Sequence, residues 1–313
     1  MSLLNNALLR PLTALLLLAA APVTVRDEVK EFRAVPAEPD LAARLTRAAE
    51  ASLKDFPKLT ADNFALSVID LSKPASPTRA DYHGDAPFYP ASLVKLFFMV
   101  AIFHQDHRTP EIERALREMI YVSDNDAAAF LVDVLTGTTS GPDLQGKALE
   151  DFLERRRILN RYFASLGYDV SVFLKPWSFG PFGRDMQILG ENKANRNRAS
   201  ANAIASLLFS IVQRKAVSVS ASDSMMALLE RPLAPPRPEE NQVKEFFGES
   251  LPEGARLWSK AGDTSEVRHD AAYVELPSGR KFIIVILTRG AADQKTLLPT
   301  IGQHLLQELD KDR

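Results

Sequence analysis

The segment that most constrains the fold runs from residue 93 to residue 103. Its sequence is LVKLFFMVAIF, in which Lys95 is the one polar residue. This density of apolar residues predicts a helix that is apolar on every side, and such a helix has to be surrounded by other elements. The chain has 313 residues, 46% of them hydrophobic, and is long enough to supply those elements and a full core. Because a buried lysine is costly unless it has a partner or a task, Lys95 is a first candidate functional residue.

The composition excludes several classes of function. The formal net charge is −2, so no overall field favours nucleic acid, and we expect no nucleic-acid partner. The chain has no cysteine, which excludes disulfides, thiol catalysis and cysteine-based metal sites. His104 and His107 lie three residues apart, but such a pair is more often a polar surface feature, and no further ligands accompany it. We expect neither a metal nor another cofactor, and we expect a monomer.

The first 25 residues differ from the rest of the chain. Arg10 is their one charged side chain, and an apolar run of 15 residues follows from Pro11 to Val25. A basic start, a short hydrophobic stretch and small residues are typical of a secretory signal. The run is shorter than the roughly 20 residues that a membrane-spanning helix needs, and an uncleaved N-terminal membrane anchor is the alternative. We expect an exported protein, periplasmic or extracellular.

After this segment the chain alternates between helical and extended patterns. Apolar side chains at helical spacing, or alternating as in strands, mark the elements. The predicted helices are 39–56, 93–103, 110–121, 124–135, 149–166, 201–214 and 294–309. The predicted strands are 64–71, 78–83, 256–260, 267–276 and 281–288. The order predicts an α/β (α+β) fold, a five-stranded sheet flanked by N- and C-terminal helices with an all-α subdomain inserted between strands 2 and 3.

The domain organisation follows from this order. Residues 1–25 are expected to be the signal peptide or anchor, and residues 26–313 to form a single catalytic domain. The two ends supply the α/β part, about 26–88 and 252–313, and the middle supplies the all-α part, about 89–251. Active sites commonly lie in the crevice between two such parts.

Ser92 and Lys95 form the first candidate catalytic motif. Residues three apart on a helix share a face, so the lysine amine can lie beside the serine hydroxyl. Burial lowers the pKa of a lysine, and a neutral lysine can take the serine proton and activate the nucleophile. The helix N-terminus favours a developing oxyanion. The alternative is a plain helix cap and a surface lysine, and the same spacing recurs at Ser278 and Lys281, in a predicted hairpin turn.

The second motif is Ser123-Asp124-Asn125. The Ser123 hydroxyl is placed to relay a proton to a leaving amine, and the Asn125 amide to hold a substrate carbonyl. The alternative is simple, because Ser-Asp-Asn followed by Asp126 is also a good helix start with early negative charge.

The third motif is Lys260-Ala261-Gly262 at the end of a predicted strand. Lys260 there can pair with a substrate carboxylate or with the oxygen of Ser123, and Gly262 allows close approach of backbone. Arg268, on the next strand, can make a bidentate pair with a carboxylate. The alternative for each residue is an ordinary surface cation at a solvated strand edge.

The three motifs together resemble the signature of class A β-lactamases and penicillin-binding proteins, S-x-x-K, S-D-N and K-T-G in that order. The resemblance covers roughly residues 40–310 and implies an antiparallel sheet. It implies that Ser92 forms the acyl-enzyme with Lys95 as its proton partner and Ser123 as the relay to the leaving nitrogen. It also implies the substrate-binding residues, which are Asn125 for the substrate amide, Lys260 and Arg268 for its carboxylate, and Gly262 and the backbone near Asp263 or Thr264 beside the oxyanion.

Three departures from the family pattern matter. Ala261 has no hydroxyl where the family has threonine or serine, which removes a hydrogen bond worth about 1 kcal/mol. Only 31 positions separate Ser92 from Ser123, a markedly shorter connection than in class A β-lactamases. The third departure concerns the base that deacylates the enzyme.

The signature of the deacylating loop is incomplete. Its expected place is 173–200, where the candidate bases are Asp185 and Glu191. Glu191 is the better candidate because Asn195 follows at the family's four-residue spacing, but Ala194 stands where leucine is expected. A solvated loop carboxylate is the alternative for both. Without a positioned base, acylation proceeds and deacylation is slow.

The leading functional hypothesis is therefore a secreted serine hydrolase that opens a β-lactam amide through an acyl-serine. A close alternative is a D-alanyl-D-alanine peptidase or penicillin-binding protein with slow deacylation, whose partner is a peptidoglycan peptide. An alternative of another class is a non-catalytic module that binds a cell-wall peptide. A pure binder does not need the proton-transfer set, so the presence of that set argues against this last interpretation.

Overall fold

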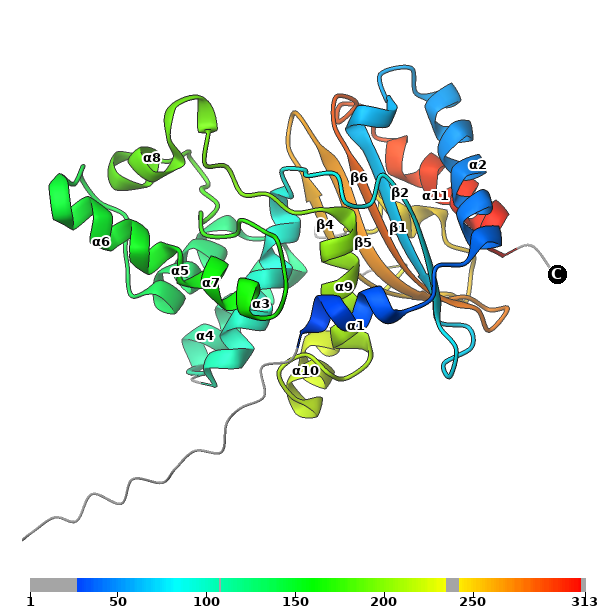
Figure 1. Ribbon diagram of the computed structural model, residues 1–313, viewed down its shortest axis with the longest axis horizontal. Coiled ribbons are helices and arrows are strands. Elements are labelled where there is room, and N and C mark those ends of the chain that lie inside the picture. Colours follow the sequence, from blue (N-terminus) through cyan, green and yellow to red (C-terminus); the bar gives the residue numbers. More distant parts are fainter. Residues whose placement is uncertain (1–26, 107, 235–241, 311–313) are drawn as a thin grey trace, which may run out of the picture.

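A computed structural model describes residues 27–106, 108–234 and 242–310. The predicted signal or anchor at residues 1–25 lies outside the described residues. In the part that is described, no helix combines the length and the apolar character needed to cross a membrane. The sheet carries two helices against one face, and the other helices lie on its opposite side (Figure 1).

The sheet has six strands in the order β2-β1-β6-β5-β4-β3, and all neighbours are antiparallel. The strands are β1 (Phe64–Asp70), β2 (Thr78–Tyr82), β3 (Glu230–Arg231), β4 (Arg256–Asp263), β5 (Arg268–Glu275) and β6 (Lys281–Thr288). The predicted number of five is wrong, because the two-residue β3 pairs with β4 at the edge. Two residues are too few for an alternating pattern, so only the pairing itself reveals this strand.

The central strands are covered on both faces. β6 contains the run FIIVIL at 282–287, and each of these residues is buried. Continuous apolar runs are typical of strands that are covered on both sides. β2, at the sheet edge, buries only Ala80. The sheet therefore needs a layer of helices on each face.

α2 (Pro39–Asp55) and α11 (Leu297–Leu309) form the layer on one face. At the start of α2 the side chain of Glu38 accepts the amide of Leu41, and Pro39 stands at the first helical position, where its missing N–H costs nothing. The apolar residues of these two helices share a core with the sheet. The buried residues of α2 recur at helical spacing and are Leu41, Leu45, Ala48, Ala49 and Ser52.

The helices on the opposite side share a second core with the other sheet face. They are α1 (Glu28–Ala34), α3 (Val94–Gln105), α4 (Pro110–Tyr121), α5 (Asn125–Thr136), α7 (Ile158–Ser165), α9 (Ala201–Val212) and α10 (Val219–Leu229). α9 lies directly against β1, β5 and β6. Helices α3 to α10 fall between β2 and β3 in chain order. The all-α part at about 89–251 stays a prediction, because its core is continuous with the sheet.

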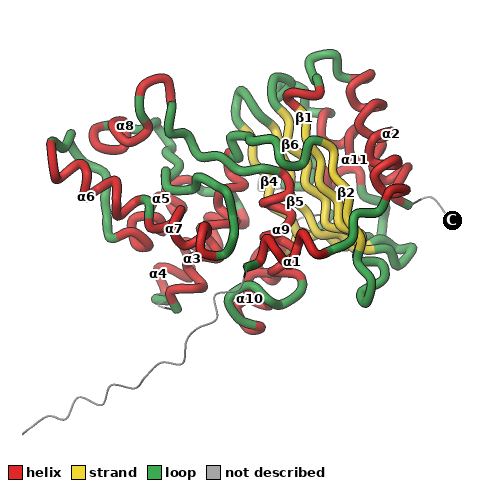
Figure 2. Tube along the Cα trace, in the orientation of Figure 1, coloured by secondary structure: helices red, strands yellow, loops and turns green. Residues whose placement is uncertain are grey.

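A third, smaller cluster of apolar residues packs α6 (Gly146–Arg156) and α8 (Gly183–Leu189) together with the long loop before α8. Figure 2 shows how much of the chain around α8 is loop. The predicted helix 149–166 is in fact two helices, α6 and α7, which meet at Arg157. The buried members of the cluster are Phe152, Phe173, Leu174, Ile188 and Leu189. The short 3-10 turns among the described residues are η1 (Ala61–Asn63), η2 (Ala91–Leu93), η3 (Glu191–Lys193) and η5 (Phe247–Ser250).

Candidate active site

The apolar segment 93–103 is a helix surrounded by protein, as predicted. α3 is buried over all but its last two residues, Lys95 included. The turn η2 leads into α3 and carries Ser92. Ala91 has a φ of 47°, a left-handed conformation that residues with a side chain rarely adopt. Such strain recurs at functional sites, where the surrounding structure holds it in place.

Lys95 contacts three of the other predicted site residues. Its Nζ is 3.0 Å from Ser92 Oγ, 3.1 Å from Ser123 Oγ and 2.8 Å from Asn125 Oδ1. Burial lowers the pKa of Lys95 to about 7, although two nearby carboxylates oppose this shift. A substantial fraction of the amine is therefore neutral at pH 7. In that form it can accept the proton of the serine.

Lys260 reaches Ser123 from β4. Its Nζ donates to Ser123 Oγ at 2.9 Å and to Gln242 Oε1 at 2.7 Å. Burial, and then the nearby charge of Lys95, lowers the pKa of Lys260. The side chains of Ser92, Lys95, Ser123 and Lys260 thus form one connected path along which a proton can move.

Ser123 and Asn125 lie at the start of α5. Ser123 has a φ of 61°, and the carboxylate of Asp124 caps the helix by accepting the amide of Ala127 at 2.6 Å. The motif therefore starts a helix and also presents two polar side chains to the buried lysine. Asn125 Nδ2 also donates to the carbonyl of Trp177 at 3.4 Å, which connects the long loop to α5.

Gly262 allows β4 to lie against the turn that carries the nucleophile. A Cβ atom at this position would stand 3.0 Å from the amide nitrogens of Ser92 and Leu93, which is tighter than ordinary packing. Asp263 and Thr264, the next residues along the chain, line the same cavity as Ser92. Strand backbone therefore lies beside the Ser92 amide, as an oxyanion hole made of two backbone N–H groups requires.

Gln242 is a site residue that sequence reasoning missed. Its Oε1 accepts from Lys260 and, at 3.1 Å, from the amide of Ala261, while its Nε2 donates to the carbonyl of Ile120 at 3.1 Å. Gln242 therefore connects β4 to the end of α4, just before Ser123. No motif marks it, because it follows a proline-rich stretch that predicts only loop.

His269 was also missed as a contributor to the site. Its Nε2 donates to the carbonyl of Tyr89 at 2.9 Å, and its Nδ1 accepts the amide of Thr288 at 3.0 Å. Burial lowers the pKa of His269 to about 4, so the ring is neutral at pH 7. A neutral ring can donate at one nitrogen and accept at the other, and it thereby holds the turn before Ser92 against the sheet.

A cavity of about 270 Å³ opens beside Ser92. The loop before α8 forms an apolar wall with Leu174, Trp177 and Pro181, while Asp263 supplies the one carboxylate among the described lining residues. The cations that line the cavity are Lys175, Lys193 and Arg196, and the remaining lining residues are Tyr89, Ala91, Val94, Asn125, Pro176, Leu189, Asn197 and Thr264.

One expectation about the third motif needs correction. Arg268 is not brought to the cavity, because its guanidinium pairs with Glu245 Oε2 at 3.2 Å and lies 4.7 Å from the ring of Phe246. Arg268 is therefore occupied within the protein and is not placed to bind a substrate carboxylate. Ala261 is buried in the core that α2 and α11 share with the sheet.

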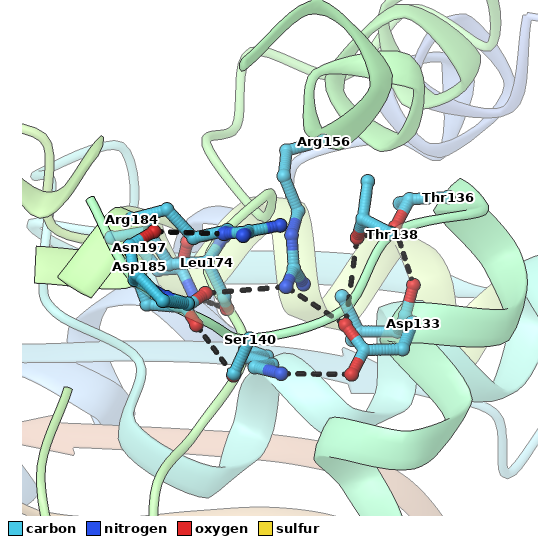
Figure 3. A network of polar contacts seen from close by, with 12 residues as sticks. Asp133, Thr136, Thr138, Ser140, Arg156, Leu174, Arg184, Asp185 and Asn197 are labelled. Carbon is cyan, nitrogen blue, oxygen red and sulfur yellow. Dashed lines mark hydrogen bonds and ion pairs between the residues drawn. The ribbon is translucent and has the colours of Figure 1, made fainter. Parts of the chain in front are cut away.

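Neither predicted deacylation base lies in the cavity. Glu191 is exposed and does not line the space beside Ser92. Asp185 is buried in a network of charges (Figure 3), where its Oδ1 pairs with Arg156 Nη2 at 3.2 Å and its Oδ2 accepts from Ser140 at 2.5 Å. The partners of Asp185 explain its burial, and Asp185 is not among the residues that line the cavity beside Ser92.

Asp133 of α5 belongs to the same network (Figure 3). Its Oδ1 pairs with Arg156 Nη2 at 2.8 Å, and its Oδ2 pairs with Lys175 Nζ at 2.8 Å. Lys175 and its neighbour Leu174 line the cavity. Two cations and two carboxylates, including Asp185, thus connect the loop wall to α5 and α6. The sequence shows these charges, but nothing in their spacing shows that they meet.

Comparisons with known proteins agree with this architecture. A sequence model of the Beta-lactamase enzyme family matches residues 104–309, whereas no curated protein sequence matches the chain. Among solved structures, the chain is similar to PBP-A, with a TM-score of 0.65 and 19% identity over 89% of this chain and 100% of that chain. It is similar to an acyl-enzyme complex of a PBP-A mutant with penicillin-G, with a TM-score of 0.64 and 18% identity over 88% of this chain and 100% of that chain. It is also similar to a β-lactamase from Sphaerobacter thermophilus, with a TM-score of 0.59 and 19% identity over 86% and 99% of the two chains.

The family model and the solved structures cover different parts of the chain. The matched segment 104–309 includes Ser123 and Lys260 but begins after Ser92 and Lys95. The solved structures extend over most of the chain, and at these identities they show a shared fold. The chain belongs to the beta-lactamase enzyme family and is a hydrolase of the serine β-lactamase kind.

Proposed function

We propose that this protein is an exported serine acyl enzyme in which Ser92 attacks the carbonyl carbon of a β-lactam or of a D-alanyl-D-alanine peptide bond. The observation that carries the proposal is the contact of 3.0 Å between Lys95 Nζ and Ser92 Oγ inside a buried path of proton donors and acceptors. The leader-like composition of the first 25 residues supports export, since both substrates lie outside the cytoplasm.

In the acylation step the neutral amine of Lys95 takes the proton of Ser92, and the Ser92 oxygen forms a bond to the substrate carbonyl carbon. The negative charge moves to the carbonyl oxygen, which the amide of Ser92 and a backbone N–H beyond Gly262 would stabilise. Asn125, whose side chain faces the same lysine, would hold the substrate amide.

The leaving nitrogen then needs a proton when its bond to the carbonyl carbon breaks. Ser123 Oγ is within 3.1 Å of Lys95 Nζ and within 2.9 Å of Lys260 Nζ. The Ser123 hydroxyl can donate its proton to the leaving nitrogen and recover one from Lys95, which took it from Ser92. Lys260 would keep Ser123 oriented and would add positive charge on the side where the leaving group lies.

Deacylation distinguishes the two candidate reactions. Glu191 and Asp185 lie away from the cavity, and Asp263 is the one carboxylate among the described residues that line it. Asp263 lies on the strand segment whose backbone would bind the oxyanion, and the negative charge of its carboxylate raises the pKa of the buried Lys95. We therefore favour a long-lived acyl-enzyme, as in a penicillin-binding protein or D-alanyl-D-alanine peptidase, over rapid β-lactam hydrolysis.

Covalent labelling with a fluorescent penicillin tests the identity of the nucleophile. Ser92→Ala should lose all covalent label, while wild-type protein is labelled. Ser278→Ala is the matched control, because Ser278 has the same spacing to Lys281 but lies in a surface turn and donates to Asp310 at 2.7 Å. This control should be labelled like the wild type.

Two results would count against the proposal. Label on folded Ser92→Ala would remove Ser92 as the nucleophile. Folded wild-type protein that reacts with neither the penicillin nor a fluorophosphonate would favour the non-catalytic binding module.

A further inference from the structure

Two cations of the loop after α8 reach across the cavity mouth to the turn between β4 and β5. Arg196 Nη1 donates to Glu266 Oε2 at 2.6 Å, and Lys193 Nζ donates to Glu266 Oε1 at 3.4 Å. Both cations line the cavity beside Ser92. Glu266 lies between Thr264, which also lines the cavity, and the start of β5.

The cavity lies on the acyl side of the nucleophile. Ser123 and Lys260, which face the leaving nitrogen, are not among its lining residues. The lining instead includes Asp263 and Thr264, on the strand segment beyond Gly262, together with Arg196. A substrate held by the oxyanion hole would therefore direct its acyl group into this space, toward the two cations.

Arg196 is held in place by an aromatic ring. Its guanidinium lies 3.5 Å from the ring centre of Tyr89, three residues before Ser92. A guanidinium carries five donors in a planar fork that matches a carboxylate. Among the residues that the structure describes, Glu266 is the one acceptor for these donors. A stacked arginine of this kind needs little further ordering to bind a second anion.

The charges at the mouth favour an anion. Arg196 and Lys193 share the single carboxylate of Glu266. Among the described residues that line the cavity there are three cations, Lys175, Lys193 and Arg196, and one carboxylate, Asp263. Lys175, the third cation of the cavity, is paired with Asp133. The side chains of Lys193 and Glu266 are 54% and 48% exposed, and that of Arg196 is 26% exposed. Both ion pairs of Glu266 are therefore open to solvent on the carboxylate side, and solvent-exposed ion pairs are weak. An incoming carboxylate can therefore compete with Glu266.

We propose that Arg196, assisted by Lys193, forms a subsite for a carboxylate carried on the acyl group of the substrate, and that Glu266 occupies this subsite when no substrate is bound. The inference rests on the proposed acylation of Ser92 and names the class of acyl group that the enzyme prefers. It assigns the binding of an acyl-side carboxylate to Arg196. Arg268, which the sequence predicts as a carboxylate-binding residue, is paired with Glu245 instead.

The test compares two penicillins that differ by one carboxylate on the acyl group, benzylpenicillin and α-carboxybenzylpenicillin. The measured quantity is the ratio of their second-order acylation rate constants. Arg196→Gln should lower the ratio of the carboxylated compound to benzylpenicillin by on the order of tenfold, because one charge-assisted hydrogen bond is lost. Arg196→Lys should recover part of the ratio, since the charge remains and the fork is lost.

Two further variants complete the experiment. Glu266→Gln removes the competing anion and should raise the same ratio severalfold. Arg198→Gln is the matched control, because Arg198 is two residues away, pairs with the exposed Asp169 at 2.8 Å and does not line the cavity beside Ser92. It should leave the ratio at the wild-type value.

The outcomes separate the subsite from the proposed acylation. An unchanged ratio in Arg196→Gln would overturn the subsite, and so would an equal loss of rate for both penicillins, which indicates only a structural role beneath Tyr89. If neither penicillin acylates the wild-type protein, the proposed function fails, and the subsite fails with it.

Discussion

Lys95 has an unusual environment for a lysine, since it lies in a helix whose other buried residues are all apolar and its amine meets only polar oxygens. Desolvation explains the direction of its pKa shift, because burial penalises the charged form. The hydrogen bonds explain why the residue is tolerated there. The same side chain is therefore both a cost to stability and the source of the base.

The rate of acylation should rise with pH and level off above about 7. Lys95 holds its proton below its pKa of about 7 and cannot act as a base there, whereas the neutral amine above that pH can. Stopped-flow measurements of penicillin acylation between about pH 5.5 and 9 would give the profile. Lys95→Met should slow acylation by on the order of 10² to 10⁴ and remove the inflection.

A second buried group, Asp270, can also cause an inflection in this pH profile. Burial raises the pKa of Asp270 to about 7, so this carboxyl titrates in the same range. An inflection that survives in Lys95→Met would belong to Asp270 or another group, and it would contradict the role given to the lysine.

The residues of the site differ in how well the sequence predicts them. Ser92 and Lys95 come together because they lie three residues apart where one helix begins. Ser123 lies 28 residues further along the chain than Lys95 and meets it through tertiary packing, which the order of the motifs indicates only through the family resemblance. Arg268 could not be placed in this way, because its actual partner, Glu245, comes from a distant loop. Gln242 belongs to no motif, and only tertiary packing brings it to Lys260.

At the scale of elements, the proposed oxyanion hole depends on the close approach of β4 to the turn that carries Ser92. Gly262→Ala would place a Cβ atom 3.0 Å from the amides of Ser92 and Leu93, so strand and turn would have to move apart. Acylation should fall by about 10-fold to 10²-fold, the range expected for a misplaced reacting group. Penicillin acylation kinetics measure the effect, and the far-UV circular dichroism spectrum controls for folding. A wild-type rate in folded Gly262→Ala would show that this contact does not position the site.

The buried network between α5, α6 and α8 should contribute strongly to stability. Asp185→Asn leaves the buried guanidinium of Arg156 with one carboxylate in place of two. Removing one partner of a buried ion pair typically costs about 3 kcal/mol or more of unfolding free energy. Urea denaturation measures the change, and Arg198→Gln, in an exposed pair, should cost less than about 1 kcal/mol. Equal effects of the two variants would mean that the network does not stabilise this wall.

The sequence predicts helices and strands correctly where their apolar pattern is long. The helix at 93–103 and the strand at 281–288 both follow from continuous apolar runs. The sequence analysis does not predict α1 and α8, with seven residues each, or β3, with two, because so few residues carry no recognisable period. It also does not predict α10, which has 11 residues and buries a serine among only three apolar side chains. The sequence predicts one helix over 149–166 because the apolar pattern continues through Arg157. In the structure the helix is interrupted at Arg157.

At the scale of the whole molecule, two cores meet at one sheet, and the site lies where β4 meets the helices α3 and α5. Ser92 and Lys95 come from α3 and the turn before it, Ser123 from the start of α5, and Lys260 from β4. No single element contains the proton path. The path therefore forms only when the helical part and the sheet have both folded and packed together.

In the proposed mechanism, the long loop around α8 determines how fast the acyl-enzyme is hydrolysed. In related chemistry a base from such a loop activates water, but here Asp185 is held by Arg156 and Glu191 is exposed outside the cavity. The loop instead supplies an apolar wall and the cations at the mouth. The arrangement favours formation of an acyl-enzyme over its hydrolysis.

Intact mass spectrometry after mixing the purified protein with penicillin-G tests this most directly. We predict an adduct with the mass of one intact penicillin, formed on Ser92, that persists over many minutes without accumulation of hydrolysed drug. An adduct that forms and decays rapidly, with hydrolysed penicillin accumulating, would contradict slow deacylation and would require a base near Ser92. The absence of any adduct on folded protein would contradict the acyl-serine mechanism itself.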